Sequence, residues 1–203
     1  MIRRLRRTTG RAGSSSARDP RREAGAAGRF RVRESVGVMS SRTGNGSGGV
    51  RQAAGDADWV DVRRLIGAYL DSLGFDVGFQ GLDPELADPA SCYGPPSGAA
   101  LLAVGDDGRA VGFTGVRAFG AEGEGELKRM YVAPEARNLG LGRALGEAAI
   151  DAARALGHRR LLLDSRASLV AACALYRDLG FVDVAPYRHN PFDDAVFLAL
   201  NLS

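Results

Sequence analysis

The sequence predicts a mixed α/β fold in which helices cover both faces of one mostly antiparallel sheet. Strand-like runs outnumber helical segments, and residues 106–109 (Asp-Asp-Gly-Arg) form a hairpin turn between two of these runs. A helical segment at 141–156 is flanked by strand-like runs at 124–132 and 160–164. Together they form a crossover, which makes one pair of strands parallel within an otherwise antiparallel series. Elements in this order favour a sheet with helices on both sides.

The first part of the predicted domain holds one short strand, at 50–53, and one amphipathic helix. Asp56 or Asp58 is expected to cap this helix, which runs to about Ser72 and ends at Gly74. Its apolar residues recur with the i, i+3, i+4, i+7 spacing that marks one face for burial. They are Val62, Leu65, Ile66, Tyr69, Leu70 and Leu73.

A looser segment over 75–98 follows, with one short helix expected from Pro84. Pro134 stops strand pairing further along the chain. Between these points lie three strand-like runs, at 99–104, 110–118 and 124–132.

The last third of the chain predicts two helices and three strands. The helix over 141–156 is amphipathic and ends at Gly157. Residues 160–164 read Arg-Leu-Leu-Leu-Asp, an apolar run typical of a central strand that is covered on both faces. The remaining elements are a helix over 168–179 that ends at Gly180, and strands at 181–184 and 195–200.

The charge of the chain is split between a basic N-terminal segment and an acidic remainder. The whole chain has 27 Lys and Arg and 24 Asp and Glu, a formal net charge of +3. Residues 1–50 carry 12 Arg and three acidic residues, so the remaining residues carry a net charge of −6. The N-terminal segment is rich in Arg, Ser and Gly and cannot bury enough apolar area to offset its chain entropy. We therefore expect a disordered tail at 1–48 and a folded domain at 49–203.

Four interpretations of this tail stay open. An Arg-rich, acid-poor composition is typical of an organelle transit peptide, of a nonspecific nucleic-acid arm or of a flexible linker. The fourth is that the natural protein starts at Met39. Lys128 is the sole lysine and the chain is rich in Ala and Gly, a bias of GC-rich coding sequences in which spurious upstream extensions arise easily.

Composition also limits the compartment and the metal chemistry. No run of about 18 apolar residues exists, so we expect no membrane span. Cys92 and Cys173 are too few for a disulfide framework, and His158 and His189 are too far apart for a zinc site. We therefore expect a cytoplasmic protein without a metal.

A glycine-containing turn between a strand and a helix is the most informative stretch. Residues 126–145 read ELKRMYVAPEARNLGLGRAL. The first turn of a helix leaves backbone N–H groups unpaired, and the helix dipole adds partial positive charge there. Gly140 and Gly142 let an anion approach the backbone closely, and Arg137 and Arg143 add charge. The stretch predicts a cradle for a phosphate or pyrophosphate.

The alternatives for this turn are two known phosphate-binding motifs and a purely structural role. A Walker A motif is excluded because no Gly-Lys-Ser/Thr follows. The dinucleotide pattern G-x-G-x-x-G has Leu145 in place of its third glycine, although Asp164 ends the next strand, where a ribose-binding acid is expected. The preceding strand carries Glu126, Lys128 and Arg129, whereas the first strand of a dinucleotide fold is apolar on both faces. The third alternative is an ordinary tight turn with helix-packing glycines.

The turn and a second motif together resemble the GNAT superfamily of acetyl-CoA-dependent N-acetyltransferases. The signature R/Q-x-x-G-x-G/A between a central strand and a helix is matched by Arg137, Gly140 and Gly142. A later helix that ends in Leu-Tyr…Gly-Phe is matched by ALYRDLGF at 174–181. The resemblance spans roughly 50–203, implies the GNAT fold, and looks like a bacterial branch.

This resemblance implies that acetyl-CoA binds along the strand before the turn and at the turn itself. Met130, Tyr131 and Val132 offer backbone groups to pantetheine, and the Met130 N–H is the expected oxyanion donor. Many relatives have an Asn before the last helix, where this chain has Ser165 and Ser168, and Ser168 is the expected contact. The residues implied at the pyrophosphate are Arg137, Asn138, Leu139, Gly140, Leu141, Gly142, Arg143 and Ala144.

Two side chains match catalytic positions of the family. Glu126 lies four residues before Met130, where some members have a general-base carboxylate. Its pKa near ~4 is far below the ~10 of an ammonium, so burial or a water relay would have to narrow the gap. Tyr176 matches the tyrosine that protonates the leaving thiolate. The alternatives are that Glu126 merely pairs with Arg129 or another surface charge, and that Tyr176 is a core tyrosine with its hydroxyl at the sheet edge.

Acceptor-binding residues are expected in two places. Arg117, on the second strand of the hairpin, is a candidate to meet an acceptor carboxylate. The segment between the last two strands contains Tyr187, Arg188, His189 and Asn190. In this family such a segment often borders the acceptor channel. The alternative is a plain polar loop. The residues expected to shape the channel with them are Phe79, Gln80 and Tyr93.

We therefore expect an N-acetyltransferase that moves the acetyl group of acetyl-CoA to a primary amine of a small molecule or peptide, by direct attack in a ternary complex. The acidic body favours a cationic amine. The alternative is a non-catalytic module that binds or senses acyl-CoA. No specific nucleic acid and no membrane are expected as partners, and the protein is expected to be a monomer or homodimer.

Overall fold

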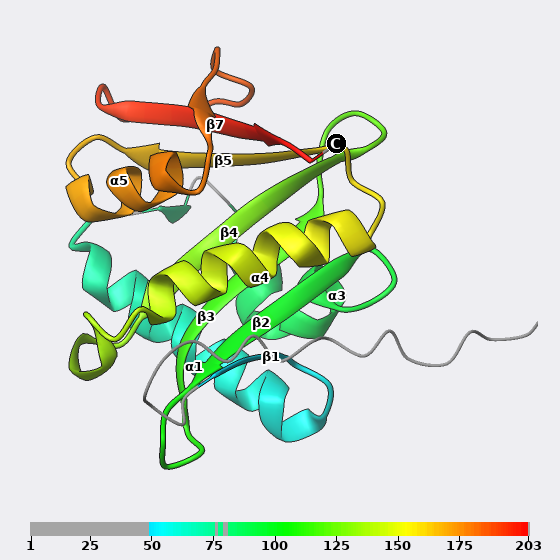
Figure 1. Ribbon diagram of the computed structural model, residues 1–203, viewed down its shortest axis with the longest axis vertical. Coiled ribbons are helices and arrows are strands. Elements are labelled where there is room, and N and C mark those ends of the chain that lie inside the picture. Colours follow the sequence, from blue (N-terminus) through cyan, green and yellow to red (C-terminus); the bar gives the residue numbers. More distant parts are fainter. Residues whose placement is uncertain (1–48, 76, 79–80, 203) are drawn as a thin grey trace, which may run out of the picture. The chain divides into compact units, whose positions relative to one another are not determined.

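The strands and helices follow the order that the sequence predicts, with one additional short helix before β2 (Figure 1). The computed structural model describes residues 49–202 apart from 76, 79 and 80, so the predicted tail at 1–48 lies outside the described residues. The strands are β1 (Gly49–Gln52), β2 (Gly98–Val104), β3 (Ala110–Ala118), β4 (Glu124–Val132), β5 (Arg160–Arg166), β6 (Val182–Asp183) and β7 (Ala195–Asn201). The helices are α1 (Asp56–Leu73), α2 (Leu82–Ala87), α3 (Pro89–Tyr93), α4 (Leu141–Ala155) and α5 (Val170–Asp178).

Within the described residues the strands form one sheet in the order β1-β2-β3-β4-β5-β7-β6. Every neighbouring pair is antiparallel except β4 and β5, which are joined by the crossover through α4. The predicted mixed sheet is therefore confirmed. The dinucleotide alternative is wrong, because the glycine turn follows a strand whose neighbour β3 runs antiparallel to it, and not the first strand of a parallel sheet.

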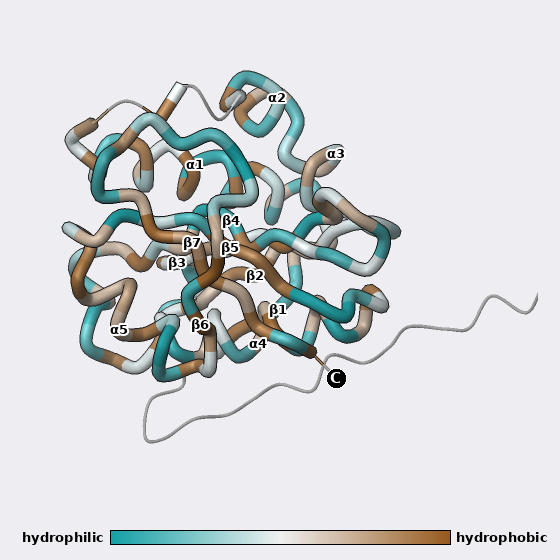
Figure 2. The backbone as a smooth tube through the Cα atoms, turned by 90° about the horizontal axis from the view of Figure 1, so that it is seen from above, coloured by the Kyte–Doolittle hydropathy of each residue, from teal (hydrophilic) through white to brown (hydrophobic). Residues whose placement is uncertain are grey.

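Helices cover both faces of the sheet, and β2 shows how the sequence achieves this. Leu101 and Ala103 belong to the core under α4 and α5, while Ala100 and Leu102 belong to the core under α1 and α3. Because successive side chains of a strand point to opposite faces, an uninterrupted apolar run fills both cores. Figure 2 shows these apolar strands in the middle of the domain, with hydrophilic segments around them.

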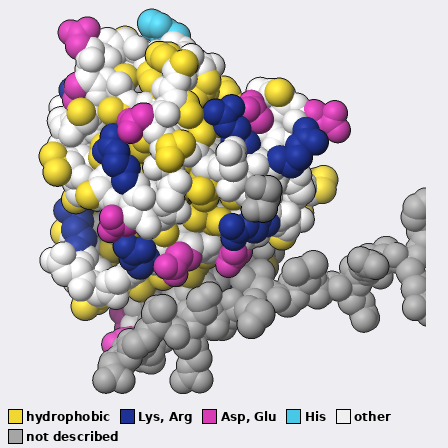
Figure 3. All heavy atoms as spheres, turned by 45° about the horizontal axis from the view of Figure 1, so that its top comes forward, with side chains coloured by type: hydrophobic (Ala, Val, Ile, Leu, Met, Phe, Trp, Pro, Cys, Tyr) yellow, Lys and Arg dark blue, Asp and Glu magenta, His cyan; other side chains and the backbone are white. Residues whose placement is uncertain are grey.

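The surface is mixed in character. On the face shown in Figure 3, basic and acidic side chains are interspersed with apolar ones, and neither sign of charge forms a continuous patch there.

Three local differences from the predicted elements have physical causes. The segment before β2 holds two short helices, because the Asp88 side chain accepts from the backbone N–H of Ser91 and so caps a second one. The N-cap of α1 is Gly55, and Asp58 instead accepts from the Ala54 N–H at 2.9 Å. The last helix starts at Val170, after a segment whose backbone is tied to Asp194.

Candidate active site

The candidate site is a cleft where β4 and β5 separate. The two strands pair from Glu124 with Arg160 to Glu126 with Leu162, and no later pair occurs among the described residues. Side chains from both strands, from the end of α1 and from α5 line the opening. They include Leu127, Lys128, Arg129 and Met130 on β4, Leu163, Asp164, Ser165 and Arg166 on β5, Tyr69 and Phe75, and Ala172 and Tyr176.

A bulge in β4 accompanies this separation. Tyr131 pairs with Phe113 and Lys128 pairs with Gly115, so β4 has one residue more than β3 between these pairs. Arg129 has a φ of 58°, a left-handed conformation that costs a non-glycine residue about 1–3 kcal/mol. A bulge bends its strand, which turns the rest of β4 away from β5.

The glycine turn presents uncapped backbone amides. Asn138 and Gly140 have φ values of 63° and 78°, which reverse the chain before α4 starts. No side chain caps α4, so the N–H groups of its first turn point outward without a side-chain acceptor. A Cβ atom at Gly142 would meet only Leu175, at 3.5 Å, so internal packing does not require glycine there.

The helix-packing role falls to a different glycine. A Cβ atom at Gly146 would clash with the side chain of Leu179. Gly146 therefore lets α5 pack against α4, whereas a Cβ atom at Gly142 would make only an ordinary contact. This difference favours the phosphate cradle over an ordinary packing turn.

Both arginines of the turn are exposed, and each already forms a polar contact within the protein. The Nε of Arg137 donates to the carbonyl oxygen of Val132 at 3.1 Å and so braces the end of β4. Arg143 forms an ion pair with Asp178 on α5 at 3.1 Å. The side chain of Leu139 is 71% exposed, and Tyr131 has its ring in the core beside Tyr69, so only its backbone can reach the cleft.

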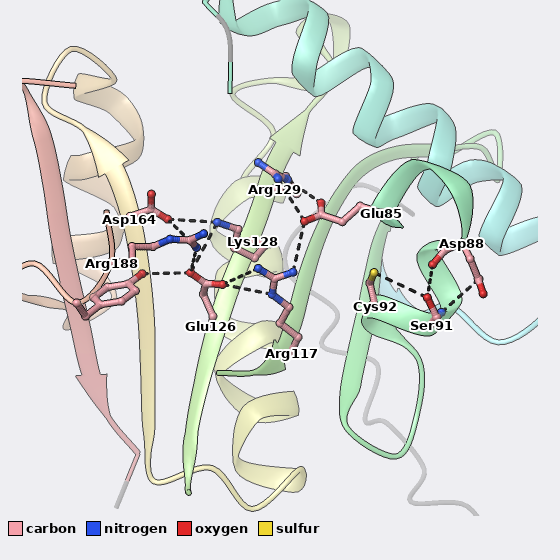
Figure 4. Close-up of polar contacts among 11 residues, drawn as sticks. Glu85, Asp88, Ser91, Cys92, Arg117, Glu126, Lys128, Arg129, Asp164 and Arg188 are labelled. Atoms are coloured by element: carbon pink, nitrogen blue, oxygen red, sulfur yellow. Dashed lines mark hydrogen bonds and ion pairs between the residues drawn. The ribbon is translucent and has the colours of Figure 1, made fainter. Parts of the chain in front are cut away.

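A buried ionic network lies beside the cleft (Figure 4). Glu126 is fully buried on β4. Its Oε2 accepts from Arg117 at 2.9 and 3.2 Å, and its Oε1 accepts from Arg188 at 2.6 Å and from the Tyr187 hydroxyl at 3.4 Å. Lys128 lies 3.7 Å from the same carboxylate.

Lys128 joins Glu126 to a second carboxylate. Its Nζ donates to Asp164 Oδ1 at 3.2 Å, and Asp164 Oδ2 accepts from Asn190 at 3.0 Å. Burial lowers the pKa of the Lys128 ammonium, an effect that the two neighbouring carboxylates oppose. Unlike Glu126, Asp164 lines the cleft.

Glu85 on α2 completes the network. It is 1% exposed and accepts from Arg129 at 2.8 and 3.2 Å, and Arg117 lies 3.5 Å away. The pair with Arg129 holds the bulge residue in its left-handed conformation and ties α2 to the sheet.

The predicted catalytic residues occupy different positions. Tyr176 lines the cleft from α5, and burial raises the pKa of its phenol. Glu126 is not a cleft-lining residue, so the predicted base role requires a relay, and the structure offers Lys128 and Asp164 as its members. The alternative pairing of Glu126 with Arg129 is wrong, because Arg129 pairs with Glu85, whereas the buried Glu126 pairs with Arg117 and Arg188.

The predicted acceptor residues are only partly brought together. Tyr93 is fully buried in the core under α1 and packs on Phe113, so it forms no wall of an acceptor channel. Arg117 bridges Glu126 and Glu85 and is occupied by these two carboxylates. His189 is exposed. Phe79 and Gln80 lie outside the described residues, while Tyr187 belongs to the ionic network.

The two serines before α5 differ in their position relative to the cleft. Ser165 lines the cleft. Ser168 is exposed and is not among the lining residues, and its N–H donates to Asp194 at 3.2 Å. Of the two, Ser165 is therefore the better placed for a cofactor contact.

Four residues of the site were not predicted as functional: Glu85, Lys128, Arg129 and Arg166. Asp164 was considered only as a ribose-binding acid in the dinucleotide alternative. A usable signal was present for two of them, because Lys128 and Arg129 are charged residues inside a strand that pairs on both sides. Such residues need buried partners. No signal pointed to Glu85, which the chain brings in from a short helix 44 positions before Arg129.

The part of the chain that the structure describes contains no group of three His, Cys, Asp or Glu placed to hold a metal ion. It also contains no helix long and apolar enough to cross a membrane.

Comparison with known proteins identifies the family. The family model for the acetyltransferase (GNAT) family matches residues 66–181. An uncharacterised N-acetyltransferase of Schizosaccharomyces pombe is 40% identical over 146 residues, which are 72% of this chain and 90% of that protein. The chain belongs to the GNAT family of acetyltransferases. Because this relative comes from a yeast, the bacterial branch is not confirmed.

Two further proteins are similar over parts of the chain. Human N-acetylaspartate synthetase is 32% identical over 127 residues, which are 63% of this chain and 39% of the human protein. The yncA protein of Salmonella typhimurium, solved with its cofactor acetyl-CoA, has a TM-score of 0.56 and 22% identity, with 77% of this chain and 94% of that chain covered. The second similarity shows the fold alone.

Proposed function

We propose that the protein transfers the acetyl group of acetyl-CoA to a primary amine of a small molecule or peptide, by direct attack of the amine on the thioester. The observation that carries this proposal is the cleft between β4 and β5 together with the uncapped glycine turn that follows β4. Membership of the GNAT family supports acetyl transfer. The name of the similar human protein, an N-acetylaspartate synthetase, supports an amino group as the acceptor.

The residues of the turn fit a pyrophosphate. The amides of residues 139–143 lie at the start of α4, where the helix dipole favours an anion, and the open space at Gly140 allows a phosphate to approach. Backbone groups of Met130 and Val132 would then hold pantetheine along β4. Acetyl-CoA supplies an activated carbonyl, and the Met130 N–H is the proposed donor to its oxygen.

The amine must lose a proton before it can attack. We assign this proton to the carboxylates beside the cleft. Asp164 takes it from the amine, and Lys128 connects Asp164 to Glu126, the base predicted from the sequence. The amine nitrogen then forms a bond to the carbonyl carbon as the bond to sulfur breaks, and the nitrogen gives its second proton to solvent. Tyr176 gives its proton to the departing thiolate and is restored from solvent.

The proposal is tested by two measurements on the full chain. Release of the CoA thiol is followed with acetyl-CoA and a panel of primary amines, and acetyl-CoA binding is measured by titration calorimetry. We expect thiol release that depends on an amine. Gly142→Asp should abolish acetyl-CoA binding, because it places a carboxylate and added bulk in the cradle.

A matched control is Gly55→Asp at the N-terminus of α1. Gly55 has an ordinary φ of −119°, and a Cβ atom there meets nothing within 4 Å. We expect normal acetyl-CoA binding in this variant. Normal binding by Gly142→Asp would contradict the cradle, and binding without turnover of any amine would favour the acyl-CoA-sensing alternative.

A further inference from the structure

Arg166 stands in the wall of the cleft with its guanidinium fixed by three neighbours. The guanidinium carbon lies 4.5 Å from the ring centroid of Phe75 and 4.2 Å from that of Phe192. The two rings pack edge to face, with centroids 5.1 Å apart. The Nε of Arg166 donates to Asp194 Oδ1 at 2.7 Å. Cation–π contacts and a charge-assisted hydrogen bond together hold this side chain in one orientation.

The far end of this guanidinium is open to a ligand. Arginine has five N–H donors, and among the described residues only Asp194, through the Nε of Arg166, accepts from them. The side chain is 24% exposed and lines the cleft. Its Nη groups therefore offer a planar pair of donors, which is the geometry that matches a carboxylate.

The position of Arg166 suits the acceptor better than the cofactor. Phe75 comes directly after α1 and its C-cap Gly74. Helix α1 covers one face of the sheet, and α4, which carries the glycine turn at its start, covers the other (Figure 1). The stacked guanidinium thus lies on the α1 side of the cleft, whereas the phosphate cradle belongs to the α4 side.

The charges around the cleft favour an anionic group. Among the described residues, the ionic network and the Arg166–Asp194 pair contain five basic and four acidic side chains, an excess of one positive charge. In a partly buried site this excess attracts an anion strongly, because the local dielectric is low. The members are Arg117, Lys128, Arg129, Arg166 and Arg188, with Glu85, Glu126, Asp164 and Asp194.

We propose that Arg166 binds a carboxylate of the acceptor, so that the substrate class is a small amine that also carries a carboxylate, an amino acid being the simplest case. This inference rests on the proposed function. Phe75, Phe192 and Tyr69 provide the apolar wall for the carbon chain. Acetylation removes the charge of the amine and leaves the carboxylate intact, so the contact with Arg166 persists through the reaction.

Matched pairs of amines test this proposal. Each amino acid is compared with its α-amide, for example L-phenylalanine with L-phenylalaninamide and L-aspartate with L-isoasparagine, and kcat/KM is measured from thiol release. We expect the wild-type protein to favour the acid. Arg166→Gln should lower kcat/KM for the acid by about 10- to 100-fold, mainly through KM, because a hydrogen-bonded charge pair is lost. The amide should be little affected, and Arg166→Lys should restore part of the preference.

Arg154→Gln is the control, since Arg154 forms a similar but exposed ion pair, with Asp151 on α4. Acetyl-CoA binding by Arg166→Gln, measured by calorimetry, shows whether the variant is folded. Equal use of acid and amide by the wild-type protein, or an equal loss for both in Arg166→Gln, would overturn the inference.

The carboxylate site can be tested even if the protein does not transfer an acetyl group. If no amine supports thiol release, binding of the same amino acids to the CoA-loaded protein is measured by calorimetry. Binding that requires Arg166 then upholds the carboxylate site while the transfer reaction is rejected. Absence of amino-acid binding to the wild-type protein rejects the carboxylate site as well.

Discussion

The phenol of Tyr176 is buried at the edge of the cleft, and its burial explains why it suits an acid role. Burial disfavours the charged phenolate and so raises the pKa of the hydroxyl. The group therefore stays protonated at neutral pH, until a thiolate next to it accepts the proton. Its ring packs edge to face on Phe181, which fixes its direction.

Tyr176→Phe should lower kcat by about 100-fold or more, because a positioned general acid contributes on this order. The affinity for acetyl-CoA should change little, since only one oxygen is removed. The measurement is steady-state thiol release together with calorimetric binding. Tyr93→Phe is the matched control, because the Tyr93 hydroxyl is also buried and forms no hydrogen bond with a described residue. A wild-type rate in Tyr176→Phe would remove the acid role.

The proton relay gives a second prediction at the scale of single residues. Asp164→Asn and Glu126→Gln should each lower kcat at neutral pH by about 100-fold or more, since each removes a proton acceptor. The loss should shrink as the pH rises toward the amine pKa of about 10, because the free amine then needs no base. A merely structural role would not produce this recovery.

The pH profile of kcat is the measurement, with melting temperature and acetyl-CoA binding as checks that the variants fold. Normal turnover in Glu126→Gln beside an impaired Asp164→Asn would show that the proton goes no further than Asp164. The base role predicted for Glu126 would then be wrong.

Sequence reasoning reached single residues only where a motif spans neighbouring positions. Gly140, Gly142 and Tyr176 lie in short motifs; the structure places Tyr176 at the cleft and the two glycines at the start of α4, where the cradle is proposed. Asp164 and Arg166 lie on one strand, but their roles depend on Asn190, Phe192 and Asp194 from a distant loop. Spacing within a strand cannot reveal partners that only the folded sheet brings together.

At the scale of elements, the sequence was more informative. Period-two and period-3.6 patterns, with Gly after each long helix, located the long helices and the strands to within a few residues. The short helix α3 was missed, and α2 begins at Leu82 where a helix was expected from Pro84, because five or six residues give too little periodicity to define a helix. There, one capping residue, Asp88, decides the local structure.

The junction of β1 and α1 gives a pH-dependent prediction at this scale. Asp58 on α1 accepts two hydrogen bonds from Arg51 on β1, each 2.7 Å long, and the pair holds its pKa at about 2, below the ordinary 3.8. A depressed pKa contributes stability above the unfolded value, and that stability is lost as the pH falls from about 4 to about 2.

Asp58→Asn should therefore lower the free energy of unfolding by about 1 kcal/mol at pH 7, a small value because Arg51 is half exposed. The difference from the wild-type protein should disappear toward pH 2. Urea denaturation across this pH range measures it, with Asp61→Asn as control, since Asp61 pairs with Arg64 only within one turn of helix. A difference that does not change with pH would contradict the ion-pair explanation.

At the scale of the whole molecule, the net charge of residues 51–203 differs in sign from the charge at the site. The chain outside its first 50 residues carries −6, which favoured a cationic amine, yet the charged side chains at the cleft have a positive excess. The charge at the cleft differs from the net charge because the fold buries arginines from several strands beside the cleft, while the other charges stay interspersed on the surface. A bound substrate interacts mainly with the charges around the cleft, so the net charge of the chain has little influence on which substrate binds.

The bulge at Arg129 changes the face of the sheet toward which the later side chains of β4 point. Leu127 and Tyr131 are four positions apart, an even spacing that would place both on one face of a regular strand. Here Leu127 belongs to the core under α4, and Tyr131 belongs to the core under α1. The one additional residue exchanges odd and even positions halfway along the strand. Deleting it would restore the alternation and reverse the facing of every later side chain, so the length of this strand is as strictly constrained as its composition.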